Sequence, residues 1–171
     1  QDPGRLVRPV GALRELAITV VDGNLVPFAD VVGIRFGQIH GAVGLELARQ
    51  APDIDEVLVP AGGGGLLAGV ALALKHLRPG IRVIGVQSAA MDGIARSLAA
   101  GKPVAVGATR TIADGVAVSG PSERTFALIQ RYVDEVVTVP DEAIAQAILA
   151  LVERAKFVVE GAGALGIAAV M

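Results

Sequence analysis

Four consecutive glycines, Gly62, Gly63, Gly64 and Gly65, constrain this chain more than any other feature. The apolar run before them (residues 57–60) predicts a buried strand, and the apolar run after them (residues 66–77) predicts a helix. Without Cβ atoms the backbone can turn tightly and admit a ligand, while free N–H groups at the helix start attract an anion. We therefore expect these glycines to bind a phosphate. A turn without a ligand is the alternative, although two glycines normally suffice for one.

The spacing around the glycines argues against the common nucleotide motifs. No Lys-Ser or Lys-Thr pair follows Gly65, which excludes the nucleotide P-loop. The dinucleotide pattern Gly-x-Gly-x-x-Gly is met only with Ala68 in its last position, and the next predicted strand ends at Gln87 rather than at an acidic residue. Nucleotide binding is therefore the weakest of the readings that remain open.

The composition excludes several classes of partner. With 15 basic and 17 acidic residues and no basic run, the chain has no footprint for nucleic acid. The uncharged stretch 57–74 is interrupted by Pro60 and the glycines, so we expect no membrane segment and a cytoplasmic protein. Hydrophobic residues make up 53% of 171 residues, which suggests apolar surface that faces a partner or a missing part. Gln1 and the uncapped apolar run before Met171 also suggest truncation at both ends.

Strand and helix patterns alternate along the chain. The predicted strands cover residues 18–21, 25–28, 57–60, 82–87 and 133–139, and the predicted helices cover 41–50, 66–77, 92–100, 122–132 and 141–157. In the last of these helices one apolar face is expected, formed by Ile144, Ile148, Leu151, Val152 and Ala155. Strand, helix and strand at this spacing predict a mainly parallel sheet in an α/β fold with three αβα layers.

Outside the glycines, few residues are candidates for chemistry. Glu160 is a lone carboxylate in an apolar stretch, so burial would require a partner or a proton; it lies either in the first turn of the last helix or against a ligand ring or substrate. The acidic-glycine turn 111–115 is a weaker candidate for close approach to a ligand. We interpret His40 and His76 as ordinary polar residues, and Asp141 with Glu142 as a helix N-terminus. No metal-binding cluster is visible.

Five segments together resemble the catalytic domain of bacterial threonine dehydratases. They are VPAGGGGLLAGVALALK, RVIGVQS, TIADGVAVSGP, VDEVVTVPDEAI and ERAKFVVEGAGALGIAA, in this order. These dehydratases are fold-type II enzymes that use pyridoxal 5'-phosphate, as do the similar serine racemases and serine dehydratases. The resemblance is specific over 57–171 and looser before it. We expect residues 1–24 to be a poorly matched segment and residues 25–171 to be one cofactor-binding α/β domain, truncated at both ends relative to the family.

The resemblance assigns roles to residues of this chain. It makes the four glycines and the Leu66 amide the cradle of the cofactor phosphate, and it places Gly115 and Glu160 near the cofactor ring. Some members bind a divalent cation through acidic residues that correspond here to Gln87 and Gly93, so no metal is expected. The implied reaction converts threonine or serine to a 2-oxo acid and ammonia. It belongs to amino-acid metabolism, and isoleucine biosynthesis is the expected pathway.

The family's Schiff-base lysine has no counterpart in this chain. Lys75, Lys102 and Lys156 lack its Ser-x-Lys context, and we expect all three in ordinary solvated positions. The chain alone is therefore expected to be inactive, because that lysine is needed for the cofactor's chemistry. Its expected partners are a small amino-acid substrate and either a second copy or the remainder of the catalytic domain. The alternative is a non-catalytic homologue that serves as a phosphate-binding or interaction module.

Overall fold

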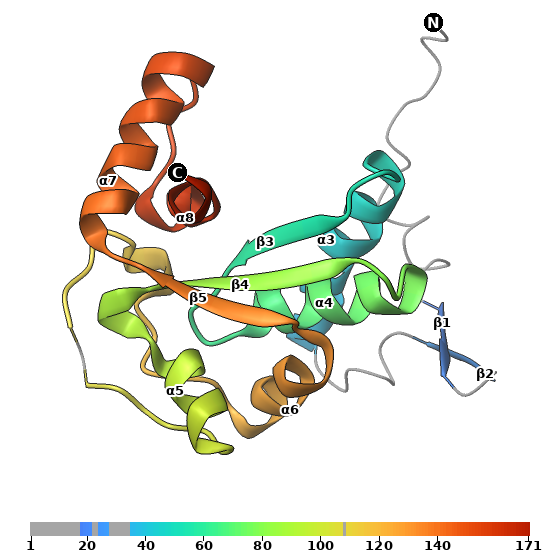
Figure 1. Ribbon diagram of the computed structural model, residues 1–171. Helices are drawn as coiled ribbons and strands as arrows, with labels where there is room; N and C mark the ends of the chain where they lie inside the picture. The colour runs from blue at the N-terminus through green and yellow to red at the C-terminus, as the bar shows by residue number, and fades with distance from the viewer. Residues whose placement is uncertain (1–17, 22–23, 28–34, 108) are drawn as a thin grey trace, which may run out of the picture.

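A parallel sheet of three strands forms the centre of the molecule (Figure 1). The computed structural model describes residues 18–21, 24–27, 35–107 and 109–171. The strands are β3 (Glu56–Pro60), β4 (Arg82–Ser88) and β5 (Glu135–Val139), in that spatial order. Helix α4 (Gly65–Leu77) connects β3 to β4. The predicted strand–helix–strand unit and its parallel pairing are confirmed.

Helices cover both faces of this sheet (Figure 1). Helices α4, α5 (Gly93–Ala100) and α6 (Glu123–Tyr132) share one core cluster with Val83 of β4. Helices α7 (Asp141–Ala150) and α8 (Gly161–Val170) share a second cluster with Val86, whose side chain points to the opposite face. The expected three-layer αβα architecture is therefore confirmed.

Two further elements precede the sheet in sequence. Strands β1 (Ile18–Val21) and β2 (Asn24–Pro27) pair antiparallel, which confirms two short strands in this region. The predicted second strand ended at Phe28, which lies outside the described residues. Short 3-10 turns, η1 (Ala89–Met91) and η2 (Asp114–Val116), occur in the connections after β4.

Helix α3 (Arg35–Gln50) begins earlier than its predicted start at Gly41. Glycine is normally unfavourable inside a helix, but here it permits close packing against α4. A Cβ on Gly44 would lie 2.9 Å from the Ala73 Cβ and 2.9 Å from the Val70 carbonyl oxygen. Contact between α3 and α4, which the sequence pattern does not contain, explains the longer helix.

The predicted helix over 141–157 is wrong in its second half. Helix α7 ends at Ala150, and a π turn, η3 (Leu151–Ala155), follows it. A π turn holds an extra residue, so it rotates the side chains after it away from the expected face. Ile144 is fully buried as predicted, whereas Val152 is 40% exposed and Ala155 is also exposed.

Candidate functional site

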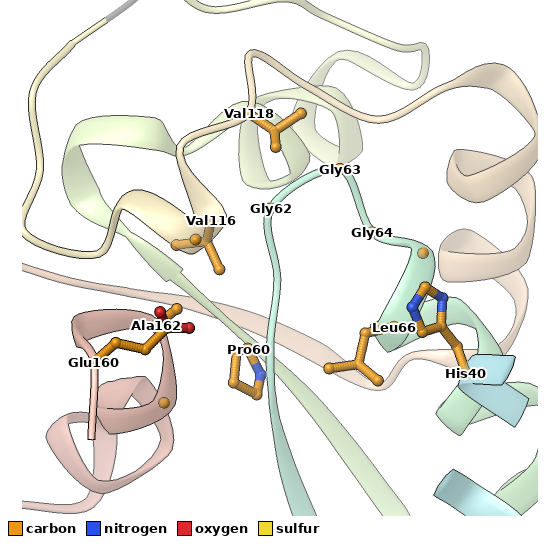
Figure 2. Close-up of a pocket in the computed structure, with 13 residues that line it drawn as sticks. His40, Pro60, Gly62, Gly63, Gly64, Leu66, Val116, Val118, Glu160 and Ala162 are labelled. Atoms are coloured by element: carbon orange, nitrogen blue, oxygen red, sulfur yellow. The ribbon is translucent and has the colours of Figure 1, made fainter. Parts of the chain in front are cut away.

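A cavity of about 400 Å³ lies where β3 ends and α4 begins (Figure 2). In parallel α/β sheets, ligands bind beyond the carboxyl ends of the strands, and this cavity has that position. All seven residues that the sequence analysis assigned to the site line it. They are Gly62, Gly63, Gly64, Gly65, Leu66, Gly115 and Glu160.

The four glycines have different structural reasons to be glycine. Gly64 precedes α4 in the left-handed region with φ of 85°, and a Cβ there would lie 2.5 Å from Ile129 Cδ1. A Cβ on Gly62 would lie 2.9 Å from the Val116 carbonyl oxygen. Gly63 has no positive φ, and a Cβ there would meet nothing closer than 3.3 Å. The turn therefore accounts for Gly62 and Gly64, and Gly63 leaves room for a ligand.

The start of α4 favours a negative charge in this cavity. The Ala68 N–H donates to the Gly64 carbonyl at 2.9 Å, which is the first bond of the helix. The N–H groups before Ala68 consequently have no acceptor within the helix, and they stand at the positive end of its dipole. With the space left by the missing Cβ atoms, these amides form a cradle that fits a phosphate.

The opposite wall comes from the segment that carries η2. Asp141, in the first turn of α7, anchors this segment: Thr111 Oγ1 donates to its Oδ1 at 2.6 Å, and the Ile112 N–H donates to its Oδ2 at 2.9 Å. Gly115 then packs against α8, since a Cβ there would lie 3.0 Å from the Ala162 Cβ and 3.1 Å from Glu160 Oε1. The 111–115 turn thus does reach the cavity, and Asp141 does lie at a helix N-terminus.

Glu160 occupies the position immediately before α8, not its first turn. Its side chain is exposed, so the expected cost of burying the carboxylate does not arise. It makes no side-chain capping bond to the helix amides. Figure 2 shows Glu160 on one side of Gly62 and His40 on the other.

His40 is the site residue that sequence reasoning missed. It lines the cavity, and its Nδ1 is buried without a hydrogen-bond partner in the described part of the chain. His76, by contrast, lies outside the cavity lining, and its Nδ1 is 2.8 Å from the Leu72 carbonyl oxygen. Nothing in the local sequence distinguishes the two histidines, because the position of His40 depends on how α3 packs on α4.

None of the three lysines lines the cavity. Lys102 and Lys156 are exposed, as expected. Lys75 differs from the expectation: its side chain is only 17% exposed, its Nζ donates to the Ile81 carbonyl at 2.6 Å, and it forms an ion pair with Asp134. This pairing ties Lys75 to the start of β5.

The end of β4 is occupied by a buried amide. Gln87 is fully buried, its Nε2 donates to the Met91 carbonyl at 3.0 Å, and its Oε1 accepts from the Ala95 N–H at 3.0 Å. A Cβ on Gly93 would lie 2.6 Å from the Ser119 carbonyl oxygen, so a longer side chain does not fit there. Within the described ranges no three His, Cys, Asp or Glu side chains could together hold a metal, and the absence of a metal here stays a prediction. No helix in those ranges has the length and apolar character needed to cross a membrane.

Comparison with known proteins identifies the family. The sequence model described as pyridoxal-phosphate dependent enzyme matches residues 23–171. The chain belongs to this family. Its cofactor is pyridoxal phosphate, and the family, the fold and the cofactor expected from the resemblance are confirmed. The glycine cradle and the unused His40 Nδ1 are compatible with the phosphate of this cofactor.

Two curated relatives illustrate the similarity. L-threonine ammonia-lyase of Thermotoga maritima is 50% identical over 132 residues, which are 77% of this chain and 33% of the relative. L-threonine dehydratase catabolic TdcB of Escherichia coli is 45% identical over 155 residues, which are 90% of this chain and 46% of the relative. The chain thus spans between a third and a half of these relatives.

Solved structures of the same family have the same fold. A bacterial threonine deaminase, from the source abbreviated T.th., superposes with a TM-score of 0.76 at 45% identity, over 78% of this chain and 51% of that one. Maize serine racemase superposes with a TM-score of 0.75 at 41% identity, over 78% of this chain and 40% of that one.

Proposed function

We propose that this chain is the phosphate-binding part of an ammonia-lyase that converts threonine or serine to a 2-oxo acid and ammonia. The observation that carries the proposal is the meeting of all seven predicted site residues around one cavity. The names of the relatives, threonine ammonia-lyase and threonine dehydratase, support the substrate class. One relative is named catabolic, which does not support the expected role in isoleucine biosynthesis.

In this proposal the amides of residues 62–65 and of Leu66 bind the cofactor phosphate. They need no side chain, so the phosphate lies against the backbone and neutralises the positive end of α4. Gly115 gives the cofactor ring access to the opposite wall, because any side chain there would contact Glu160 and Ala162. The phosphate and the Glu160 carboxylate then stand at different walls of the cavity, which limits their repulsion.

The bound cofactor would supply an electron sink for reactions at the α-carbon of an amino acid. The chain's own contribution is to position and shield it. Val116, Val118 and Ala162 line the cavity with apolar surface that excludes water from the ring. Glu160, exposed at the edge, is placed to orient a ring or a substrate by accepting a hydrogen bond.

The finer parts of the proposal concern the whole molecule. We propose that residues 25–171 form one cofactor-binding domain, that the attachment lysine is absent from this chain, and that the chain alone is inactive. A second copy or the remainder of the catalytic domain would complete the site. A non-catalytic module would share the phosphate cradle, so phosphate binding tests the site and lysine attachment tests the activity.

The cradle is tested by placing a negative charge in it. Gly63→Asp has space for a side chain and introduces a carboxylate where the phosphate binds. We expect the affinity of the full chain for pyridoxal phosphate, measured by calorimetry, to fall about tenfold or more, the equivalent of at least ~1.4 kcal/mol. The melting temperature without ligand should stay close to that of the parent.

Gly80→Asp is the matched control, because Gly80 is exposed and a Cβ there meets nothing within 4 Å. This variant should bind pyridoxal phosphate like the parent chain. Equal affinity of Gly63→Asp and Gly80→Asp would contradict the cradle. Stabilisation by NAD or ATP without stabilisation by pyridoxal phosphate would favour nucleotide binding instead.

A further inference from the structure

We propose that His40 is the side-chain hydrogen-bond donor of the anion site, and that its Nδ1 binds the phosphate held by the glycine cradle. The inference rests on the proposed function, since it adds a residue to the same site. It concerns a residue on α3, far from the glycines in sequence. The ligand chemistry is a phosphate group, either free or as the ester of the cofactor.

The His40 ring lies directly against the start of α4. A Cβ on Gly65 would come 3.3 Å from His40 Nδ1 and 3.4 Å from its Cε1. Figure 2 shows the imidazole beside Leu66 and Gly64, within the cavity lining. The absence of a side chain at Gly65 therefore leaves Nδ1 beside the amides that would bind the anion.

Close helix packing fixes the ring in this place. Gly69 lies one turn after Gly65 on α4, and a Cβ there would lie 2.8 Å from the His40 Cβ and 2.9 Å from the Gly41 backbone nitrogen. The two backbones can approach this closely only because Gly69 has no side chain. His40 is consequently held by the main-chain contact between α3 and α4, and its ring needs little rearrangement to bind a ligand.

The Nδ1 atom lacks a partner that its surroundings should provide. It is shielded from solvent, and within the described residues no group hydrogen-bonds to it. Buried polar atoms in folded proteins are nearly always hydrogen-bonded, so an unpaired one beside a cavity indicates a missing ligand. The other cavity-lining side chains are apolar or absent, except the carboxylate of Glu160. Among them, only the imidazole can donate a hydrogen bond to an anion.

The proposal is tested directly by nitrogen NMR of the histidine side chains in the full chain. There are only two histidines, and His76→Gln assigns the signals. Inorganic phosphate and pyridoxal phosphate should both shift the His40 Nδ1 resonance, whereas pyridoxal, which has no phosphate, should not. The His76 resonance should stay in place with all three ligands.

A pair of variants separates hydrogen bonding from packing. His40→Asn retains an amide donor near the Nδ1 position, while His40→Leu has a similar size and no donor. We expect His40→Leu to bind inorganic phosphate and pyridoxal phosphate about tenfold more weakly, as the loss of a charge-assisted hydrogen bond predicts. His40→Asn should stay within about threefold of the parent. Circular dichroism checks that both variants are folded, and the NMR titration of the parent needs neither of them.

The outcomes separate this inference from the proposed function. Unchanged phosphate affinity in His40→Leu, or an unmoved His40 resonance while pyridoxal phosphate binds, would overturn the role of His40 and leave the cradle intact. Failure of the parent chain to bind inorganic phosphate or pyridoxal phosphate would overturn both. A shift by pyridoxal alone equal to that by pyridoxal phosphate would show that the ring, not the phosphate, contacts His40, and would also overturn the inference.

Discussion

At Gly64 the backbone enters α4 with φ of 85°, a conformation that costs an ordinary L-residue about 1–2 kcal/mol. A side chain there would also press on Ile129, which is fully buried between α4 and α6. Both costs fall on the folded state. Gly64 is therefore a structural requirement of the site, independent of any ligand.

Gly64→Ala should lower the free energy of unfolding by about 2–4 kcal/mol, the sum of the backbone cost and the overpacking of Ile129. Urea denaturation measures this change. The control is Gly101→Ala, because Gly101 also has a positive φ, of 67°, but open space around it. Its loss should be about 1–2 kcal/mol. Equal losses in the two variants would show that the contact with Ile129 relaxes freely.

Single residues show where sequence reasoning succeeds and where it stops. The glycines, Leu66 and Gly115 could be predicted because a run without Cβ atoms before a helix has one dominant physical use. His40 could not, because its place in the cavity arises from α3 packing on α4. The exposure of Glu160 was also missed, because an apolar neighbourhood in sequence does not fix which side chains are covered in space.

At the scale of elements, an ion pair joins α4 to the sheet. Lys75 near the end of α4 binds Asp134, which precedes β5, at 2.8 Å, and Asp134 Oδ2 accepts from the Val83 N–H of β4 at 2.7 Å. Burial by itself would raise the pKa of Asp134. The hydrogen bonds from Lys75 and Val83, with the charges of Lys75 and Arg82, outweigh burial and hold this pKa below the ordinary aspartate value.

The lowered pKa makes this junction sensitive to acid. A carboxyl group whose folded pKa is depressed stabilises the fold above its unfolded pKa, about 3.9, and loses that contribution as the pH falls through the folded value. Asp134→Asn should therefore lower the unfolding free energy at pH 7 by about 1 kcal/mol, a modest value because the pair is partly open to water. Below about pH 4 the difference from the parent should shrink.

Urea denaturation from pH 7 to pH 3 measures this dependence. Glu135→Gln is the control from the same strand, since its pair with Arg82 is about half exposed on both sides. Its effect should stay under about 0.5 kcal/mol at pH 7. A difference between Asp134→Asn and the parent that grows toward acid pH would contradict the assignment.

The order of elements was predictable because their signals are local. The apolar run of β4, the cap of α6 by Ser122 and the breaking turn after α4 all lie within a few residues. The end of α7 was not predictable in this way. Its apolar spacing continues past Ala150, and only the structure shows the π turn and Lys156 in the left-handed region with φ of 61°.

At the scale of the whole molecule, the apolar composition leaves its mark on the surface. Val158 is 91% exposed, and Phe157 and Val170 are each 64% exposed, in the segments around α8. Monomeric proteins rarely leave several large apolar side chains exposed together. These side chains agree with the expectation that part of the apolar surface faces a partner or the remainder of the catalytic domain.

The last prediction concerns the attachment lysine, which this scale alone can test. Lys75 is held in an ion pair, and Lys102 and Lys156 are exposed and lie outside the cavity lining. Pyridoxal phosphate should therefore bind the full chain without forming a stoichiometric imine. Borohydride reduction and peptide mass mapping should find no lysine labelled to one equivalent, and Lys75→Arg, Lys102→Arg and Lys156→Arg should each bind the cofactor like the parent. Full labelling of one lysine would instead give this chain its own attachment site, and the proposed inactivity of the chain alone would be wrong.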